Sequence, residues 1–60
     1  MQNTQEKKFL TAADVAEYMS ISKSMAYTII RKMNKELESR GKIIVHGKIS
    51  RRYFEEKIYV

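Results

Sequence analysis

The sequence contains no cysteine and a single histidine, His46. Without cysteine, neither disulfides nor thiolate metal sites can hold the fold together, and one histidine cannot build a zinc site. No apolar run approaches the ~20 residues that span a bilayer, and no apolar core of a signal peptide is visible. The residue types also offer no nucleophile–base pair and no metal-ligand set. These absences predict a cytoplasmic protein that is not an enzyme and uses no cofactor or metal.

Length is the next limit, because 60 residues make one domain at most. A chain of this size buries only ~60% of the surface that its unfolded form exposes, so its stability is marginal. There is no room for a deep cleft between two layers. The fold therefore depends on apolar packing among a few elements.

The net charge of +5 is unevenly distributed along the chain. Lysines and acidic residues balance in residues 1–30, whereas residues 31–60 carry nine lysines and arginines against four glutamates. A one-sided basic excess favours a polyanionic partner, either nucleic acid or an anionic membrane surface.

Two helices are predicted in the first two thirds of the chain. Residues 1–8 are polar and aperiodic and are expected to form a flexible tail, so the domain spans residues 9–60. Thr11 is a typical N-cap for a helix over about 12–19, with Asp14 in its first turn. Ser22 caps a second helix over about 23–40, which Gly41 ends. The second helix carries an apolar stripe at helical spacing: Ala26, Ile29, Ile30, Met33 and Leu37.

After Gly41 the pattern changes to a β-branched run and a turn signal, which predicts a β-hairpin over about 42–50. A two-residue turn at His46-Gly47 would set Ile44 opposite Ile49. A three-residue loop through Lys48 would set Val45 opposite Ile49 instead. Ser50 can then cap a last helix over about 51–58. The predicted fold class is mainly α with a small β-hairpin, in the order α-α-β-β-α.

Two helices joined by a turn of about three residues are typical of DNA-binding helix-turn-helix units. The stretch from Leu10 to Arg31, LTAADVAEYMSISKSMAYTIIR, resembles the helix-turn-helix of the excisionase and MerR-like winged-helix family. The stretch from Gly41 to Lys57, GKIIVHGKISRRYFEEK, is similar to the wing and closing helix of small members from phages and integrative elements. One departure is Ser20, where many such units place glycine because the turn requires positive φ. Either Ser20 takes that conformation at a cost of ~1 kcal/mol, or the turn has another geometry.

The resemblance implies a winged helix-turn-helix that binds double-stranded DNA, with the second helix in the major groove and the wing near the minor groove. Such proteins direct a recombinase towards excision or regulate transcription. The expected setting is therefore the bacterial cytoplasm and nucleoid, in a bacterial or phage-encoded mobile element. The expected partners are DNA, an integrase or recombinase, or a second copy of the chain, with no membrane and no small-molecule substrate.

The candidate DNA-binding residues follow the outer face of the second helix and the basic second half of the chain. Base contacts are expected from Lys23, Ser24, Tyr27 and Thr28, and phosphate contacts from Ser22 and Arg31. Tyr27 could equally be a half-buried packing residue. The hairpin tip would touch the backbone or minor groove through His46, Gly47 and Lys48. Arg51 and Arg52 stand in the first turn of the last helix, where the helix dipole disfavours cations, so a phosphate is expected nearby.

Three other functions fit the sequence less well than DNA binding does. A protein-interaction module, either an adaptor or an inhibitor with an acidic partner surface, would need a large exposed apolar patch. The polar outer face of the second helix argues against it. RNA binding lacks an evident aromatic stacking platform. An enzyme is the least favoured, since no catalytic set exists.

Overall fold

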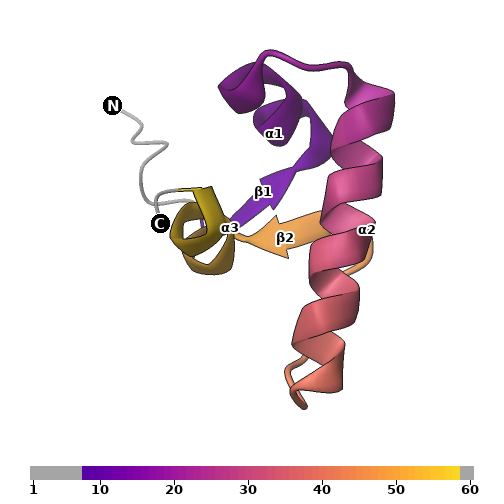
Figure 1. Cartoon of the computed structure of the whole chain (residues 1–60), viewed down its shortest axis with the longest axis vertical. Coiled ribbons are helices and arrows are strands. Elements are labelled where there is room, and N and C mark those ends of the chain that lie inside the picture. Colours follow the sequence, from indigo (N-terminus) through magenta and orange to yellow (C-terminus); the bar gives the residue numbers. More distant parts are fainter. Residues whose placement is uncertain (1–7, 59–60) are drawn as a thin grey trace.

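The computed structural model of this protein describes residues 8–58. They form three helices and two short strands (Figure 1). The elements are β1 (Phe9–Thr11), α1 (Ala12–Met19), α2 (Lys23–Ser39), β2 (Lys48–Ser50) and α3 (Arg51–Ile58). All three predicted helices are confirmed, and the end of α2 differs from the prediction by one residue. The tail predicted for residues 1–8 stays a prediction, because residues 1–7 lie outside the described part. None of the described helices is long and apolar enough to cross a membrane.

Side-chain caps fix the start of each helix. At α1, Thr11 Oγ1 accepts a hydrogen bond from the Asp14 N–H at 3.2 Å, and Asp14 Oδ2 accepts one from the Thr11 N–H at 2.9 Å. This reciprocal pair satisfies two N–H groups that the helix itself leaves unbonded. Ser22 Oγ accepts from the Met25 N–H, and Ser50 Oγ accepts from the Tyr53 N–H. All three caps predicted from the sequence are confirmed.

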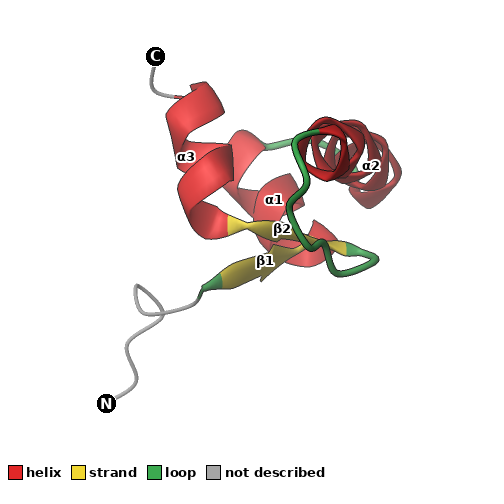
Figure 2. Cartoon of the chain, turned by 90° about the horizontal axis from the view of Figure 1, so that it is seen from below, coloured by secondary structure: helices red, strands yellow, loops and turns green. Residues whose placement is uncertain are grey.

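The sheet differs from the prediction. β2 pairs antiparallel with β1, with Leu10 opposite Ile49. The predicted hairpin over 42–50 is wrong, and so are both of its registers, because residues 42–45 pair with no strand within residues 8–58. Figure 2 shows this segment as a loop that runs from the end of α2 to β2. β1 and β2 are far apart in the sequence, so no local turn sets their pairing. The burial of Ile49, which is fully buried, sets it instead.

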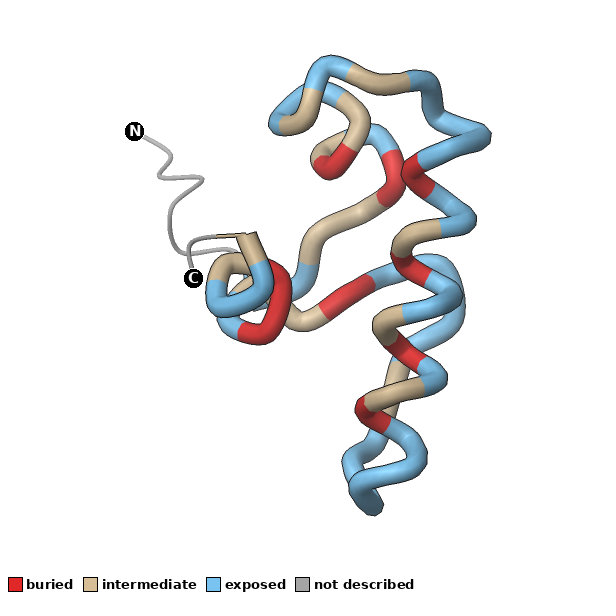
Figure 3. The backbone as a smooth tube through the Cα atoms, viewed as in Figure 1, coloured by how far each residue is buried: buried red, intermediate tan, exposed pale blue. Residues whose placement is uncertain are grey.

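One small core joins all five elements. Its buried members are Ala12, Val15, Ala26, Ile30, Leu37, Ile49, Tyr53 and Phe54. Buried residues of α2 recur along the side that faces α1 and the sheet, and the opposite side is exposed (Figure 3). The stripe predicted for α2 therefore forms most of its contact with the core, although Ile29 is only half-buried. Burying one side of α2 leaves its other side free for a partner.

The turn between α1 and α2 contains a strained backbone position at Ser20. Ser20 has φ 57° and ψ 48°, so it adopts the left-handed conformation for which glycine is better suited. Of the two geometries open from the sequence, the structure has the one with positive φ.

Replacing Ser20 by glycine should therefore stabilise the protein. We expect Ser20→Gly to raise the free energy of unfolding by about 0.5–1 kcal/mol, and the melting temperature by a few °C. The reverse control is Gly41→Ser, since Gly41 has φ 81° and open space around its Cα. That variant should lose about 1 kcal/mol. Thermal unfolding of both variants by circular dichroism is the measurement, and a destabilised Ser20→Gly would contradict the strain.

Candidate nucleic-acid interface

Helices α1 and α2 are joined by only three residues, 20–22, and pack directly against each other. The Ile21 N–H donates to the Ala16 carbonyl at 3.0 Å, which closes the end of α1. Val15 and Ala26 are fully buried, and Ala16 is packed against the same cluster. Small side chains at this crossing allow the two helices to approach closely. The packing fixes the direction in which α2 leaves the body of the molecule.

The outer face of α2 is exposed from its first turn onward. All the recognition residues predicted on this helix are exposed: Lys23, Ser24, Tyr27, Thr28 and Arg31. Tyr27 is 48% exposed, so about half of its surface is covered by the protein and the rest is open to a partner. Thr28 Oγ1 donates to the Ser24 carbonyl at 3.3 Å, which leaves its oxygen lone pairs available as acceptors. This face therefore offers donors, acceptors and an aromatic ring to a partner.

Residues 42–47, here called the arm, lie beside the C-terminal half of α2. Ile44 packs against the core cluster. Asn34, a residue of α2 that is only 6% exposed, donates from its amide nitrogen to the Lys48 carbonyl at 2.9 Å and to the Val45 carbonyl at 3.4 Å. Buried amides of this kind are costly to leave unbonded, so Asn34 fixes the arm against the helix. The arm takes the place of the predicted hairpin.

An open groove of about 570 Å³ lies between exposed residues of α2 and of the arm. Tyr27, Arg31 and Lys35 line it from the helix, and His46 and Gly47 line it from the arm. Gly47 has φ 78°, a conformation that glycine adopts without strain. The structure thus brings together two predicted sets of residues, one on the second helix and one at the hairpin tip. It also adds Lys35, which the sequence reasoning missed.

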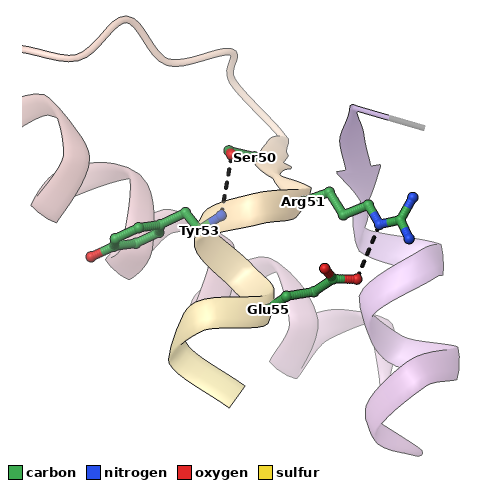
Figure 4. A network of polar contacts seen from close by, with 4 residues as sticks. All are labelled: Ser50, Arg51, Tyr53 and Glu55. Atoms are coloured by element: carbon green, nitrogen blue, oxygen red, sulfur yellow. Dashed lines mark hydrogen bonds and ion pairs between the residues drawn. The ribbon is translucent and has the colours of Figure 1, made fainter. Parts of the chain in front are cut away.

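The two arginines at the start of α3 differ in their surroundings. Arg51 Nε contacts Glu55 Oε2 at 3.0 Å, one helical turn away, and the Arg51 N–H donates to the Lys8 carbonyl at 2.9 Å. Arg52 is exposed. Arg51 and Tyr53 leave the first turn on opposite sides (Figure 4). Arg51 therefore already has an anionic neighbour, and Arg52 is the better candidate for a phosphate contact.

Tyr53 ties α3 to α2 and is not available to a ligand. Its hydroxyl donates to Glu36 Oε1 at 2.6 Å, and Lys57 Nζ lies 3.4 Å from the same oxygen. The hydrogen bond from Tyr53 lowers the pKa of Glu36, and the same bond raises the pKa of Tyr53. At neutral pH both groups therefore keep the protonation states that the bond requires. The hydrogen-bond and ion-pair partners of Glu36, Tyr53 and Lys57, both lie on α3.

One curated relative resembles this chain over most of its length. It is ICEBs1 excisionase from Bacillus subtilis (strain 168), 37% identical over 49 residues, which cover 82% of this chain and 77% of the relative. The chain belongs to the excisionase family. No protein-family profile and no solved structure matches it. The excisionase part of the sequence-based resemblance is confirmed, and the MerR-like part stays a prediction.

Two residues of this candidate interface were not predicted from the sequence. Asn34 lies within the apolar stripe of α2, between Ile30 and Leu37, and a polar residue at such a position is a signal for a specific hydrogen bond. Lys35 follows Arg31 by one helical turn, so its place on the same face could have been read from the spacing. The partners of Asn34, the carbonyls of Val45 and Lys48, could not be predicted, because residues 42–50 were expected to form a hairpin.

Proposed function

We propose that this protein is an excisionase of a mobile element, a recombination directionality factor that binds double-stranded DNA and has no catalytic role of its own. The observation that carries the proposal is the 37% identity to ICEBs1 excisionase over most of both chains. The recombinase would perform the strand exchange, and this chain would bind the end of the element. A second role as a transcriptional regulator fits the same DNA-binding surface.

The shape and charge of the interface support duplex DNA as the partner. In the proposal, α1 and α2 act as a helix-turn-helix, and α2 enters the major groove. A helix with its side chains is about 10–12 Å across, and the major groove is about 12 Å wide. The buried side of α2 faces the core, so its exposed side is the one that can enter the groove.

Different residues would position the protein and read the sequence. Lys23, Ser24, Tyr27 and Thr28 would face base edges, where side-chain hydrogen bonds distinguish the base pairs. Phosphates on either side would be bound by residues of four elements: Ser22, Arg31 and Lys35 at α2, His46 in the arm, Lys48 in β2, and Arg51 and Arg52 in α3. The Ser22 oxygen accepts the capping bond, so its hydroxyl hydrogen remains available to a phosphate oxygen. The backbone of Gly47 would approach the DNA most closely.

Removing a base-reading side chain should reduce specificity. We expect Lys23→Ala and Tyr27→Ala each to weaken binding to the cognate site by about 1–3 kcal/mol, while binding to random DNA changes little. Both side chains are exposed, so the variants should fold normally. Titration of labelled cognate and random duplexes by fluorescence anisotropy is the measurement. An equal loss on both duplexes would show that these residues contact only the backbone.

The role of the protein can be tested directly on its element. A footprint over the element's ends and promoters separates excision from regulation, because each role requires a site in a different place. Excision is then measured with the recombinase of the element, with and without this protein. An excisionase raises the yield of excised circle. A protein that binds only a promoter and leaves that yield unchanged is a regulator, and the proposed role in excision then fails.

A further inference from the structure

The arm exposes the apolar side chain of Ile43 to solvent, where it does not contribute to the core. Ile43 is 92% exposed, and Val45, two residues later, is 41% exposed. Ile44, between them, is partly buried against the core. This alternation is that of an extended segment with one face inward and the other outward. Ile43 and Val45 therefore lie on the same outward face of the arm.

The backbone on both sides of Ile43 is fixed to α2. On one side, the Lys42 N–H donates to the Leu37 carbonyl at 3.0 Å. On the other side, Asn34 bonds the carbonyls of Val45 and Lys48, and the Lys48 N–H donates to Val45 at 3.1 Å. A side chain held between two such anchors loses little conformational entropy when it is inserted into a partner.

The charge around this apolar side chain indicates what it contacts. In the sequence, Ile43 is flanked by Arg40, Lys42, His46 and Lys48, and the nearest acidic residue along the chain is Glu38, which lines the groove between α2 and the arm. A second copy of the chain would bring two like-charged arms together, which opposes self-association through this face. A membrane surface needs a broad apolar face, and Ile43 with Val45 offers a narrow one. Duplex DNA fits both the basic charge and the narrow apolar face of the arm, because it is a polyanion with a narrow minor groove.

We propose that Ile43 inserts into the minor groove and wedges between two base pairs, with Val45 against the adjacent sugars and the flanking cations on the phosphates. This rests on the proposed function, because it requires a duplex on the α2 surface. Ile44, His46 and Gly47 of the arm line the groove shared with α2, whereas Ile43 and Val45 lie outside it and are exposed to solvent. Apolar wedges of this kind unstack a base step and kink the duplex by roughly 20–90°. Flexible pyrimidine–purine steps are the preferred place for insertion.

The test uses the full chain with duplexes that carry 2-aminopurine at successive positions of the footprinted site. Wild-type protein should raise the fluorescence of 2-aminopurine at one step, where stacking is lost, and should bend an end-labelled duplex as measured by energy transfer. Ile43→Ala should abolish the fluorescence rise and most of the bend, while the complex still forms. Ile43→Leu, which keeps an apolar wedge, should restore both signals. The exposure of Ile43 means that neither variant threatens the fold.

The possible failures are distinguishable. If wild-type protein binds no duplex, the proposed function fails and this inference falls with it. If wild-type protein and Ile43→Ala bind with the same fluorescence and bend, only the wedge is overturned. Two further measurements without DNA can also overturn the wedge. It is overturned if the only effect of Ile43→Ala is a loss of self-association in sedimentation, or if its only effect is a loss of binding to anionic vesicles.

Discussion

Raising the salt concentration from about 50 to about 200 mM should weaken DNA binding by roughly a few hundred- to a thousandfold. The reason is counterion release: if Arg31, Lys42, Lys48, Arg51 and Arg52 neutralise about 4–6 phosphates, log affinity falls against log salt with a slope of about −4 to −5. The basic excess of residues 31–60 supplies these charges. Titrations of one duplex at several salt concentrations give the slope. A slope near zero would contradict an electrostatic interface.

Arg52→Ala separates the contribution of α3 from that of the arm. Arg52 is exposed in the first turn of α3, where a cation opposes the helix dipole. We expect the variant to make the slope shallower by about one unit on every DNA sequence, with unchanged or slightly raised thermal stability. The matched control is Lys32→Ala, which removes an equal charge from the part of α2 near Glu36 and should leave the slope unchanged. Unfolding of Arg52→Ala with no change in slope would make the arginine structural.

Asn34→Ala should release the arm and destabilise the fold. The substitution removes both hydrogen bonds from the amide to the Val45 and Lys48 carbonyls. Loss of a buried donor costs about 1–3 kcal/mol, which is a large share of the stability of so small a domain. The expected fall in melting temperature is about 4–8 °C for each kcal/mol. Thermal and urea unfolding measure it.

The effect on the arm can be measured separately from global stability. In Asn34→Ala, the amide hydrogen of Lys48, which bonds to the Val45 carbonyl, should exchange faster than amides in the middle of α2. DNA affinity should fall as well, because an unanchored arm must be ordered on binding. Lys35→Ala is the adjacent control: it should weaken DNA binding through lost charge and leave unfolding and Lys48 exchange unchanged. Wild-type exchange at Lys48 in Asn34→Ala would show that Asn34 does not hold the arm.

The caps and the apolar spacing were enough to place the helices from the sequence. Thr11, Ser22 and Ser50 each accept from the N–H three residues on, a local interaction that any chain with these residues can form. The buried face of α2 follows from a period of 3.6 residues. The residues of α2 that do not belong to this buried face are expected to be exposed, and they include most of the proposed DNA-reading residues. At Ser20 the resemblance to helix-turn-helix units left two turn geometries open, and the structure has the one with positive φ.

The strand pairing could not be predicted in this way. The β-branched run after Gly41 has the composition of a strand, and a nearby turn made a hairpin the simplest local solution. The structure instead pairs β2 with residues 9–11, which are too few to show any periodicity of their own. That pairing depends on bringing the start of the domain next to Ile49, a long-range contact that buries Ile49 completely.

By itself, the sequence determined the three helices, their caps, the outward face of α2 and the basic charge of the second half. Each of these depends on residues within one or two turns of one another, so local hydrogen bonding and periodicity decide it. Only the tertiary structure decided where the arm lies and that Asn34 donates to the Lys48 carbonyl. It also decided that Glu36 accepts a hydrogen bond from Tyr53 and pairs with Lys57, both of α3. Those contacts join residues that are distant along the chain. They form because burying Ile49, Tyr53 and Phe54 against α1 and α2 leaves few other positions for the polar groups around them.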